Sequence, residues 1–224
     1  MNPDAVAEVI SRLRAIDTEH QPSDGARVFN SVYLKVTEMM LDRLTTGGVF
    51  HDASFVIDLD VRFAGYWFDA YDAPGDKPRA WAPLFDARAR TDLAPIQFAL
   101  AGINAHIEHD LPLAVVDTCA ARGCTPTTQG VQQDYDKINE LLASIEAGIR
   151  RSFLTRVEQC VDDHLESVAH LISSWDIAKA RDFAWINVAT LWELRRMTPI
   201  FDSYAETLAR TVGMGSRLLL TPLL

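Results

Sequence analysis

The stretch LAPIQFALAGINAHIEHDLPLAVVDTCAAR, residues 93–122, decides the fold of this chain. Its apolar side chains recur every three or four residues, as on one face of a helix, and Ile96, Leu100 and Ile107 mark that face. Gly123 directly follows and is a natural helix end, because glycine readily adopts a left-handed conformation. The pattern predicts one long helix over residues 93–122, among the most buried of the molecule.

Two histidines and an aspartate lie in the middle of this apolar stretch, where burial is costly unless each finds a partner. His106 and Asp110 are one turn apart and flank the apolar face on the same side. His109 points away from that face, and Asn104 flanks its other side. Pro112 cannot donate a helical hydrogen bond, so we expect a kink there and a free carbonyl group nearby. This segment is the first candidate for a functional site.

Helical periodicity continues through nearly the whole chain, whereas the alternation typical of strands is nearly absent. We expect helices over about residues 3–16, 24–44, 52–71, 93–122, from after Pro126 to 173 with a break near Ser152, 176–197, and a last one to 212. A proline-rich loop with Trp81 lies between the third and the fourth. Because no repeat or linker divides the chain, residues 1–224 are predicted to form a single all-α domain, an irregular bundle of about six to seven helices.

Composition excludes several classes of protein. With 224 residues and 48% hydrophobic residues, the chain can bury a substantial core. Its net charge of -10 argues against binding to nucleic acid or to an anionic membrane surface. No apolar run is long enough to span a membrane, and Asp4 and Glu8 do not suit a signal peptide, so we expect a cytoplasmic protein.

The three cysteines fit neither a disulfide framework nor a zinc pattern. Cys119 and Cys124 are close in sequence and Cys160 is distant, so we expect small buried apolar residues with one free thiol. The tail over residues 218–224 is strongly apolar. It is predicted to dock onto the bundle, and the alternative is a homodimer contact through the same tail.

Two further charged residues fall on apolar faces. Asp60 lies inside the apolar face of the helix over 52–71, and Arg181 lies on the apolar stripe of the helix over 176–197. A buried carboxylate needs a partner or a raised pKa. Because arginine prefers to bind carboxylates through two hydrogen bonds, Arg181 is the expected partner of Asp60.

Three interpretations of these residues remain open. The first is an enzyme acting on a small apolar or anionic molecule, with His106 as base, Asp60 and Asp110 as its carboxylate partners, and Arg181 holding an anionic group. The second is a non-catalytic ligand-binding or interaction protein whose buried polar cluster is structural. The third is a divalent metal ion bound by His106, Asp110 and Asp60, as in a metal-dependent hydrolase or oxygenase.

Four more residues are candidates for contacts with a small-molecule ligand, because they lie on or beside the apolar faces of the predicted helices. They are Asn104, Asp134, Trp67 and Trp185.

Several motifs along the chain resemble a bacterial family of uncharacterised all-helical proteins, a domain of unknown function of about this length. They include Phe29-Asn30-x-x-Tyr33, Leu59-Asp60-Val61, Trp81-x-x-Leu84-Phe85, Asn104-Ala105-His106-Ile107-x-x-Asp110-Leu111, Asp134-Tyr135 and Ala180-Arg181. The resemblance covers nearly the whole chain and implies one helical domain, but it implies no activity. Similar proteins often carry Asn in place of Glu108, which makes Glu108 a poor candidate for a ligand.

Overall fold

The central rod of the molecule is built from the stretch that the sequence singles out. In the computed structural model, which describes residues 4–159 and 176–222, this rod consists of α5 (Pro95–Ala105) and α6 (Leu111–Arg122). A π-helical turn, η1 (His106–Asp110), joins the two. The predicted helix over 93–122 is therefore present but interrupted, because Pro112 cannot supply the backbone donor that an α-helix needs.

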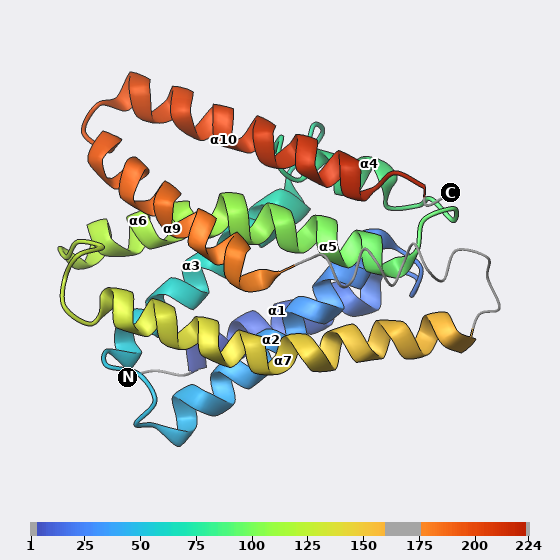
Figure 1. Ribbon diagram of the computed structural model, residues 1–224, viewed down its shortest axis with the longest axis horizontal. Helices are drawn as coiled ribbons and strands as arrows, with labels where there is room; N and C mark the ends of the chain where they lie inside the picture. The colour runs from blue at the N-terminus through green and yellow to red at the C-terminus, as the bar shows by residue number, and fades with distance from the viewer. Residues whose placement is uncertain (1–3, 160–175, 223–224) are drawn as a thin grey trace.

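The rest of the described chain is also helical (Figure 1). The remaining helices are α1 (Asp4–Glu19), α2 (Gly25–Thr46), α3 (Ala53–Asp72), α4 (Ala82–Ala87), α7 (Val131–Gln159), α9 (Ile177–Leu194) and α10 (Thr198–Leu219). No strand occurs in the described ranges, so the predicted all-α bundle is confirmed. None of the helices in those ranges combines the length and apolarity required to cross a membrane.

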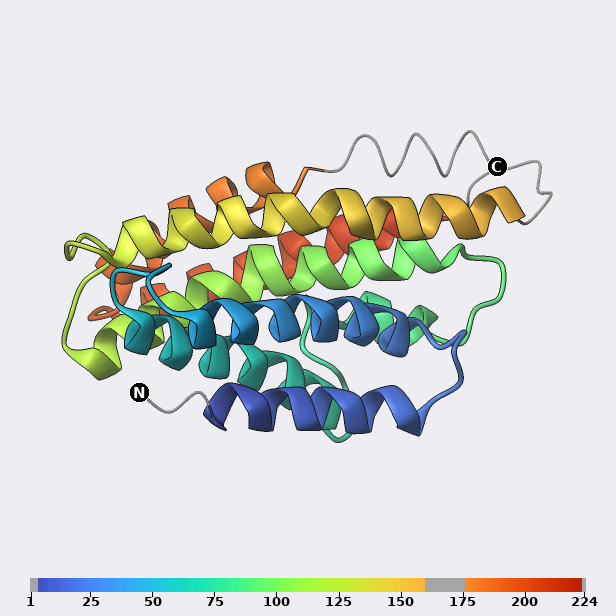
Figure 2. The same cartoon turned by 90° about the horizontal axis from the view of Figure 1, so that it is seen from below.

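The central rod is covered by different partners along its length. α5 packs against α2 and α10, and α6 packs against α3 and α9. Figure 2 shows α1 and α7 on opposite outer sides of the bundle, with the rod between them. Nearly all buried apolar side chains form one continuous core around the rod, which includes Trp67, Trp81 and Phe98. In the middle of the rod, His106, Ile107 and Asp110 of η1 are buried, whereas Glu108 and His109 are partly exposed.

Local sequence signals explain where several helices begin and end. Asp24 caps α2 by accepting hydrogen bonds from the backbone N–H groups of Ala26 and Arg27. Asp176 caps α9 in the same way. Gly123 ends α6 in the left-handed conformation, with φ of 66°, as predicted.

Other predicted boundaries are wrong for identifiable reasons. The proline-rich loop contains α4, which is too short to show a periodicity in the sequence. α7 begins only at Val131, because the preceding Gly130 has a φ of 95°. It continues through Ser152 without the predicted break. Residues 160–173 of that predicted helix lie outside the described residues.

The last helix reaches Leu219 rather than residue 212. Gly213, which suggests a helix end in the sequence, instead lets α10 approach another segment closely, because a methyl group there would overlap the carbonyl oxygen of Arg79.

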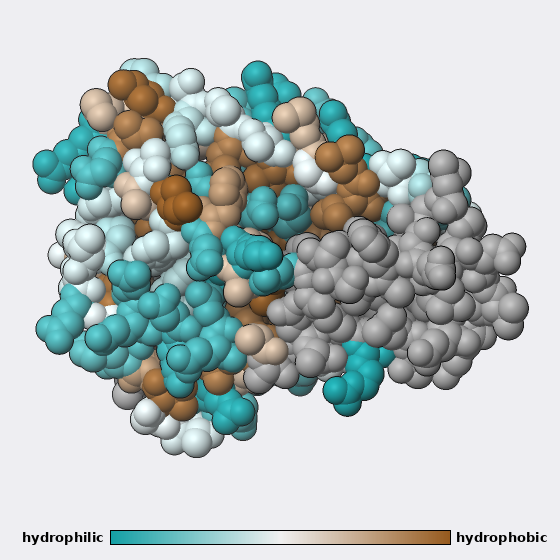
Figure 3. All heavy atoms as spheres, viewed as in Figure 1, coloured by the Kyte–Doolittle hydropathy of each residue, from teal (hydrophilic) through white to brown (hydrophobic). Residues whose placement is uncertain are grey.

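The C-terminal segment docks onto the bundle as predicted. The Nε2 group of Gln97 in α5 donates to the carbonyl oxygens of Leu219 and Thr221, at 2.8 and 2.6 Å, and Leu220 is buried. Leu218, in contrast, is 78% exposed. On the face seen in Figure 3, apolar residues lie scattered among polar ones. The homodimer contact through this tail stays a prediction, and residues 223–224 lie outside the described residues.

Candidate functional site

The π-helical turn builds the centre of the candidate site. The N–H of Leu111 donates to the carbonyl oxygen of His106, five residues back, so this turn holds one residue more than an α-helical turn. The wider turn changes the direction of the side chains between His106 and Asp110. Because such turns are rare and often occur at functional sites, η1 marks this region independently of its residue types.

Asp110 is the hub of the site. Its carboxylate is 1% exposed and meets three donors. The Oδ2 atom accepts from Trp81 Nε1 and lies near His106 Nδ1, both at 3.0 Å, and Oδ1 lies 2.7 Å from His109 Nδ1. Burial alone would raise the pKa of Asp110, but the hydrogen bonds with His106 and His109 hold it below its ordinary value. Asp110 is therefore a buried carboxylate that stays ionised.

The prediction that His109 points away from the site is wrong. At 100° per residue His109 would face away from Asp110, but the extra residue in η1 brings its ring onto the second carboxylate oxygen. His109 also lines an open groove of about 1250 Å³ between residues 73–86 and α10. Asp110 thus separates one histidine at a solvent groove from another in the interior.

His106 is the interior histidine, and aromatic rings enclose it. Its ring stacks on Phe63 with centroids 3.5 Å apart and packs edge-on against Tyr33 at 4.6 Å. Its Nε2 atom is buried and has no hydrogen-bond partner within the described part of the chain. Burial lowers the pKa of His106, although Asp110 opposes this. A neutral ring donates from Nδ1 to the Asp110 carboxylate, which leaves Nε2 as an unprotonated acceptor.

Two more buried polar atoms have no hydrogen-bond partner among the described residues, namely the hydroxyl of Tyr33 in α2, whose ring packs against His106, and Oδ2 of Asp60 in α3. Burial raises the pKa of Asp60 to about 7. Burial also raises the pKa of Tyr33, and the charge of Asp60 adds to this effect. The phenol therefore keeps its proton, and Asp60 is partly protonated near neutral pH.

Tyr33 and Asp60 line a cavity of about 50 Å³ between α2, α3, α7 and α9. Its other polar lining residue is Arg181, and the remaining walls are apolar, formed by Val36, Met40, Val56, Leu59, Phe63, Leu111, Ile138 and Leu142. Because buried polar groups in native proteins are nearly always hydrogen-bonded, the unpartnered atoms beside this cavity indicate a place for a bound molecule or water.

Arg181 lies in this cavity wall but does not pair with Asp60, so the predicted ion pair is wrong. Its guanidinium donates to Asn139 Oδ1 and lies over the ring of Tyr135, 4.3 Å from the centroid. Helix phase correctly predicted that Arg181 is buried, at 3% exposed. Helix phase shows which face a residue lies on but not how far along the helix its partner lies. The partners that Arg181 reaches, Asn139 and Tyr135, are both on α7.

The four further ligand-contact candidates are engaged elsewhere in the fold. Asn104 donates to Val212 O and Ser216 Oγ of α10, each at 3.0 Å. Both oxygens of Asp134 accept from backbone N–H groups of residues 51 and 52, at 2.6 and 2.8 Å. Trp185 packs against Tyr135. None of the three lines the cavity beside Asp60.

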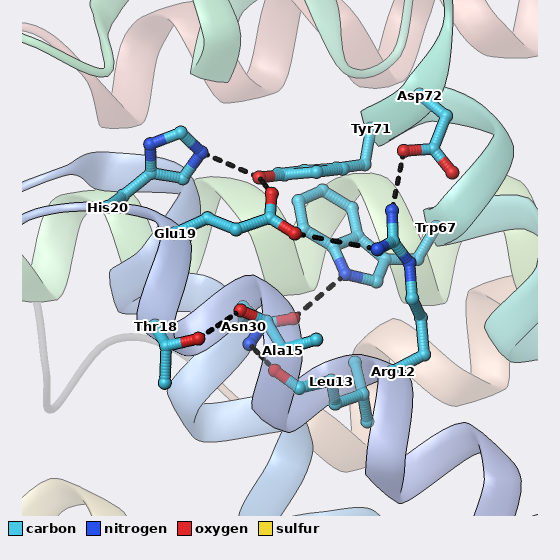
Figure 4. A network of polar contacts seen from close by, with 10 residues as sticks. All are labelled: Arg12, Leu13, Ala15, Thr18, Glu19, His20, Asn30, Trp67, Tyr71 and Asp72. Carbon is cyan, nitrogen blue, oxygen red and sulfur yellow. Dashed lines mark hydrogen bonds and ion pairs between the residues drawn. The ribbon is translucent and has the colours of Figure 1, made fainter.

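Trp67 belongs to a structural network between α1, α2 and α3 (Figure 4). Its Nε1 group donates to Asn30 Oδ1 at 3.1 Å, and Asn30 Nδ2 donates to Leu13 O at 2.8 Å. Nearby, His20 lies within hydrogen-bond distance of Tyr71 at the surface of the same corner. This network holds three helices together and does not reach the cavity.

The proposed metal ligands are not gathered into one set. Within residues 4–159 and 176–222, no group of three or more His, Cys, Asp or Glu side chains is placed to hold a metal ion. His106 and Asp110 are in contact, but Asp60 lies with Tyr33 on the cavity side. The described residues therefore give no support to the metal-dependent interpretation.

The sequence prediction missed Tyr33 and the role of Trp81. A usable signal for Tyr33 is its place on the apolar face of α2, four residues after Phe29, which puts a phenolic hydroxyl inside the core. Trp81 is harder to find, because it lies in a segment without periodicity and reaches Asp110 only through the tertiary fold.

Residues 6–222 match a protein family described as a family of unknown function, DUF5995. No curated protein and no solved structure matches the chain.

Proposed function

We propose that this protein is an acid–base enzyme. The chain belongs to DUF5995, a family of unknown function. Its substrate is a small, largely apolar molecule with an anionic group, from which it removes a proton next to a carbonyl group. One observation carries this proposal. Three buried polar atoms have no hydrogen-bond partner among the described residues, namely Tyr33 Oη, Asp60 Oδ2 and His106 Nε2. Tyr33 and Asp60 line one cavity, and the ring of His106 packs against Tyr33 and Phe63 in the wall of that cavity.

His106 is the proposed base. Its Nδ1 faces the ionised carboxylate of Asp110, so the ring is held in one orientation and Nε2 carries a lone pair. Because burial lowers the pKa of His106, the neutral form is available at neutral pH. Asp110 stabilises the imidazolium that forms when Nε2 accepts a proton.

Tyr33 and Asp60 are the proposed donors to the substrate oxygen. Removing a proton next to a carbonyl group makes an enolate, whose oxygen carries negative charge. A protonated tyrosine and a carboxylic acid kept neutral by an apolar site are suited to stabilise that oxygen. The raised pKa values of both groups supply these protonated forms.

Arg181 and the apolar walls define the substrate class. The guanidinium is the cation that lines the cavity, and it suits a carboxylate or a similar anionic group. A volume of about 50 Å³ admits only a few heavy atoms, so a larger molecule requires side chains such as Met40 to move. The substrate is therefore expected to be short.

Proton exchange in D₂O tests this function without knowledge of the natural substrate. α-Ketobutyrate is the anionic probe and butanone is its neutral counterpart, and NMR follows exchange of the protons next to the carbonyl group. We expect wild-type protein to accelerate the exchange of α-ketobutyrate, and His106→Gln to lose at least about 100-fold of that acceleration. Arg181→Gln is expected to slow the proton exchange of α-ketobutyrate more than that of butanone.

His20→Gln is the matched control, because His20 contacts Tyr71 at the surface rather than Asp110. It should exchange both probes like wild type, and circular dichroism should show that every variant is folded. Equal acceleration by wild type and His106→Gln would contradict the role of the base. Absence of both exchange and thermal stabilisation with either probe would favour the alternative class, a non-catalytic protein whose polar cluster is structural.

A further inference from the structure

The C-terminal end of α6 brings two cysteines together. Gly123 N–H donates to Ala120 O at 3.3 Å, and Cys124 N–H donates to Cys119 O at 3.0 Å. This pair of hydrogen bonds around a left-handed glycine is a Schellman motif. In this motif the two residues joined by the outer bond commonly make an apolar side-chain contact, and here both of them are cysteines.

The two thiols are close but differently exposed. Cys119 is completely buried, whereas Cys124 is partly exposed, and both pack against the main core. Burial raises the pKa of Cys119 to about 12, and the charge of Cys124 and a hydrogen bond with its thiol add to this effect. One thiol thus meets solvent while its neighbour is sheltered directly beneath it.

Arg122 lies next to the turn that carries the exposed thiol, and its guanidinium donates to the carboxylates of Asp58 and Asp52, at 2.6 and 3.0 Å. The pKa of Arg122 is raised first by its hydrogen bond to Asp58 and, in smaller part, by the charge of Cys124. Solvent access decides which of two neighbouring cysteines meets an oxidant first, and Cys124 is the more exposed of the two. Cys124 is therefore placed to react first, and Cys119 is placed to respond to that reaction.

We infer that Cys119 and Cys124 are a modification site that closes into a reversible intramolecular disulfide when the protein meets a low-molecular-weight disulfide such as oxidised glutathione. The Cys124 thiolate attacks one glutathione sulfur, which forms a mixed disulfide and releases one glutathione thiolate. The Cys119 thiol then loses its proton to solvent and attacks the Cys124 sulfur, releasing the second glutathione thiolate. Two protein thiols are oxidised, and one glutathione disulfide is reduced to two thiols.

The geometry distinguishes this pair from an accidental contact. The outer hydrogen bond of the Schellman motif holds the two backbones in place, so closing the disulfide requires side-chain rotation rather than movement of a helix. The four residues between the cysteines end in Gly123, whose φ of 66° is already that of the closed turn. Backbone approach, which limits most proposed disulfides, is present in the folded protein.

The test uses the full-length Cys160→Ser protein, in which Cys119 and Cys124 are the only thiols. Incubation with oxidised glutathione should reduce the thiol count from two to zero and leave the protein two hydrogens lighter, without bound glutathione. A reducing agent should restore both thiols. Trypsin cleaves after Arg122, between the cysteines, so peptides 91–122 and 123–137 should remain linked until reduction.

Two matched variants in the same background separate the steps. Cys119→Ser should stop at a glutathione adduct on Cys124, and Cys124→Ser should keep Cys119 as a free thiol. Two unreacted thiols, a stable glutathione adduct or a disulfide-linked dimer in Cys160→Ser would each overturn the inference. If a variant fails to fold by circular dichroism, the tryptic linkage in Cys160→Ser decides the question alone.

Discussion

A single carboxylate, that of Asp110, determines what the neighbouring side chains can do. Three donors share its two oxygens, so His106, His109 and Trp81 are each held in one orientation. The carboxylate also decides which nitrogen of His106 carries the proton, and therefore which nitrogen can act as a base. The identity of the residue at position 110 thus controls a property of position 106.

Asp110→Asn tests this dependence through stability. The amide keeps the shape of the side chain but loses the charge. Its NH₂ group is a donor and would face the donors of His106, His109 or Trp81, which had bound the carboxylate. We expect a loss of about 3–5 kcal/mol in the free energy of unfolding, the usual cost of breaking a buried charged network. Urea unfolding measures this loss. Asp117→Asn, further along the same rod and exposed, should cost less than about 1 kcal/mol.

Asp60→Asn tests the unpartnered carboxyl group through pH. The pKa of Asp60 is about 7 in the folded protein, against an ordinary value of 3.8. Between these values the folded state holds a proton that the unfolded chain has lost, so stability falls as the pH rises through this window. Asn mimics the protonated acid and removes this dependence.

Urea unfolding at about pH 5 and about pH 8 should therefore show Asp60→Asn gaining about 2 kcal/mol relative to wild type at the higher pH. Asp69→Asn, on the exposed face of the same helix, is the control and should follow wild type. An unchanged difference between Asp60→Asn and wild type across this range would mean that Asp60 is ionised throughout.

At the residue scale, the sequence predicts which side chains are inside better than it predicts their partners. Helix phase correctly places His106, Asp110 and Arg181 in the interior, because phase follows directly from residue spacing. It cannot predict that Arg181 turns to Asn139 instead of Asp60, because the choice depends on how helices from distant parts of the chain are offset.

Among the elements, η1 and α10 are the two that regular periodicity cannot describe. η1 departs from 100° per residue within an otherwise regular rod, so the sequence predicts the rod but not the position of His109. The glycines of α10 suggest a helix end, although Gly213 is needed for close packing. In both cases the local pattern is overridden by a contact that forms only in the folded protein.

Gly213→Ala tests the close approach of α10. In an isolated helix this change would be stabilising by about 1 kcal/mol, because alanine has the higher helix propensity. Here the added methyl group meets the backbone carbonyl of Arg79, which cannot move aside as a side chain could. We expect a net loss of about 1–3 kcal/mol. Thermal unfolding measures it, with Gly65→Ala in α3, where nothing lies within 4 Å, as a neutral or stabilising control.

For the molecule as a whole, contacts distant in sequence fix how the helices are stacked. Asp134 at the start of α7 binds the backbone of residues 51 and 52, just before α3, and is 2% exposed. The helical class and the single bundle were predictable, because amphipathic periodicity extends through the chain. The stacking was not, since it depends on such individual polar contacts.

Asp134→Asn tests whether this contact holds α7 in place. The amide retains one acceptor oxygen and turns an NH₂ group toward the second backbone N–H, which is left without a partner. We expect a loss of about 1–3 kcal/mol in urea unfolding. Hydrogen exchange should also increase at the N–H groups of residues 51 and 52. Asp136→Asn, exposed on the same turn of α7, should change neither measurement.

The extra residue in η1 has a consequence for how this sequence can change by insertion and deletion. A π-turn is equivalent to an α-helix into which one residue has been inserted. Deleting Glu108 would therefore leave a continuous α-helix with α5 and α6 in nearly the same rotational phase, but it would change the spacing of His106 and Asp110 from four residues to three. The rod could survive such a deletion while His106, His109 and Asp110 lost one another. A change in chain length at position 108 would thus remove the site and leave the helical fold in place.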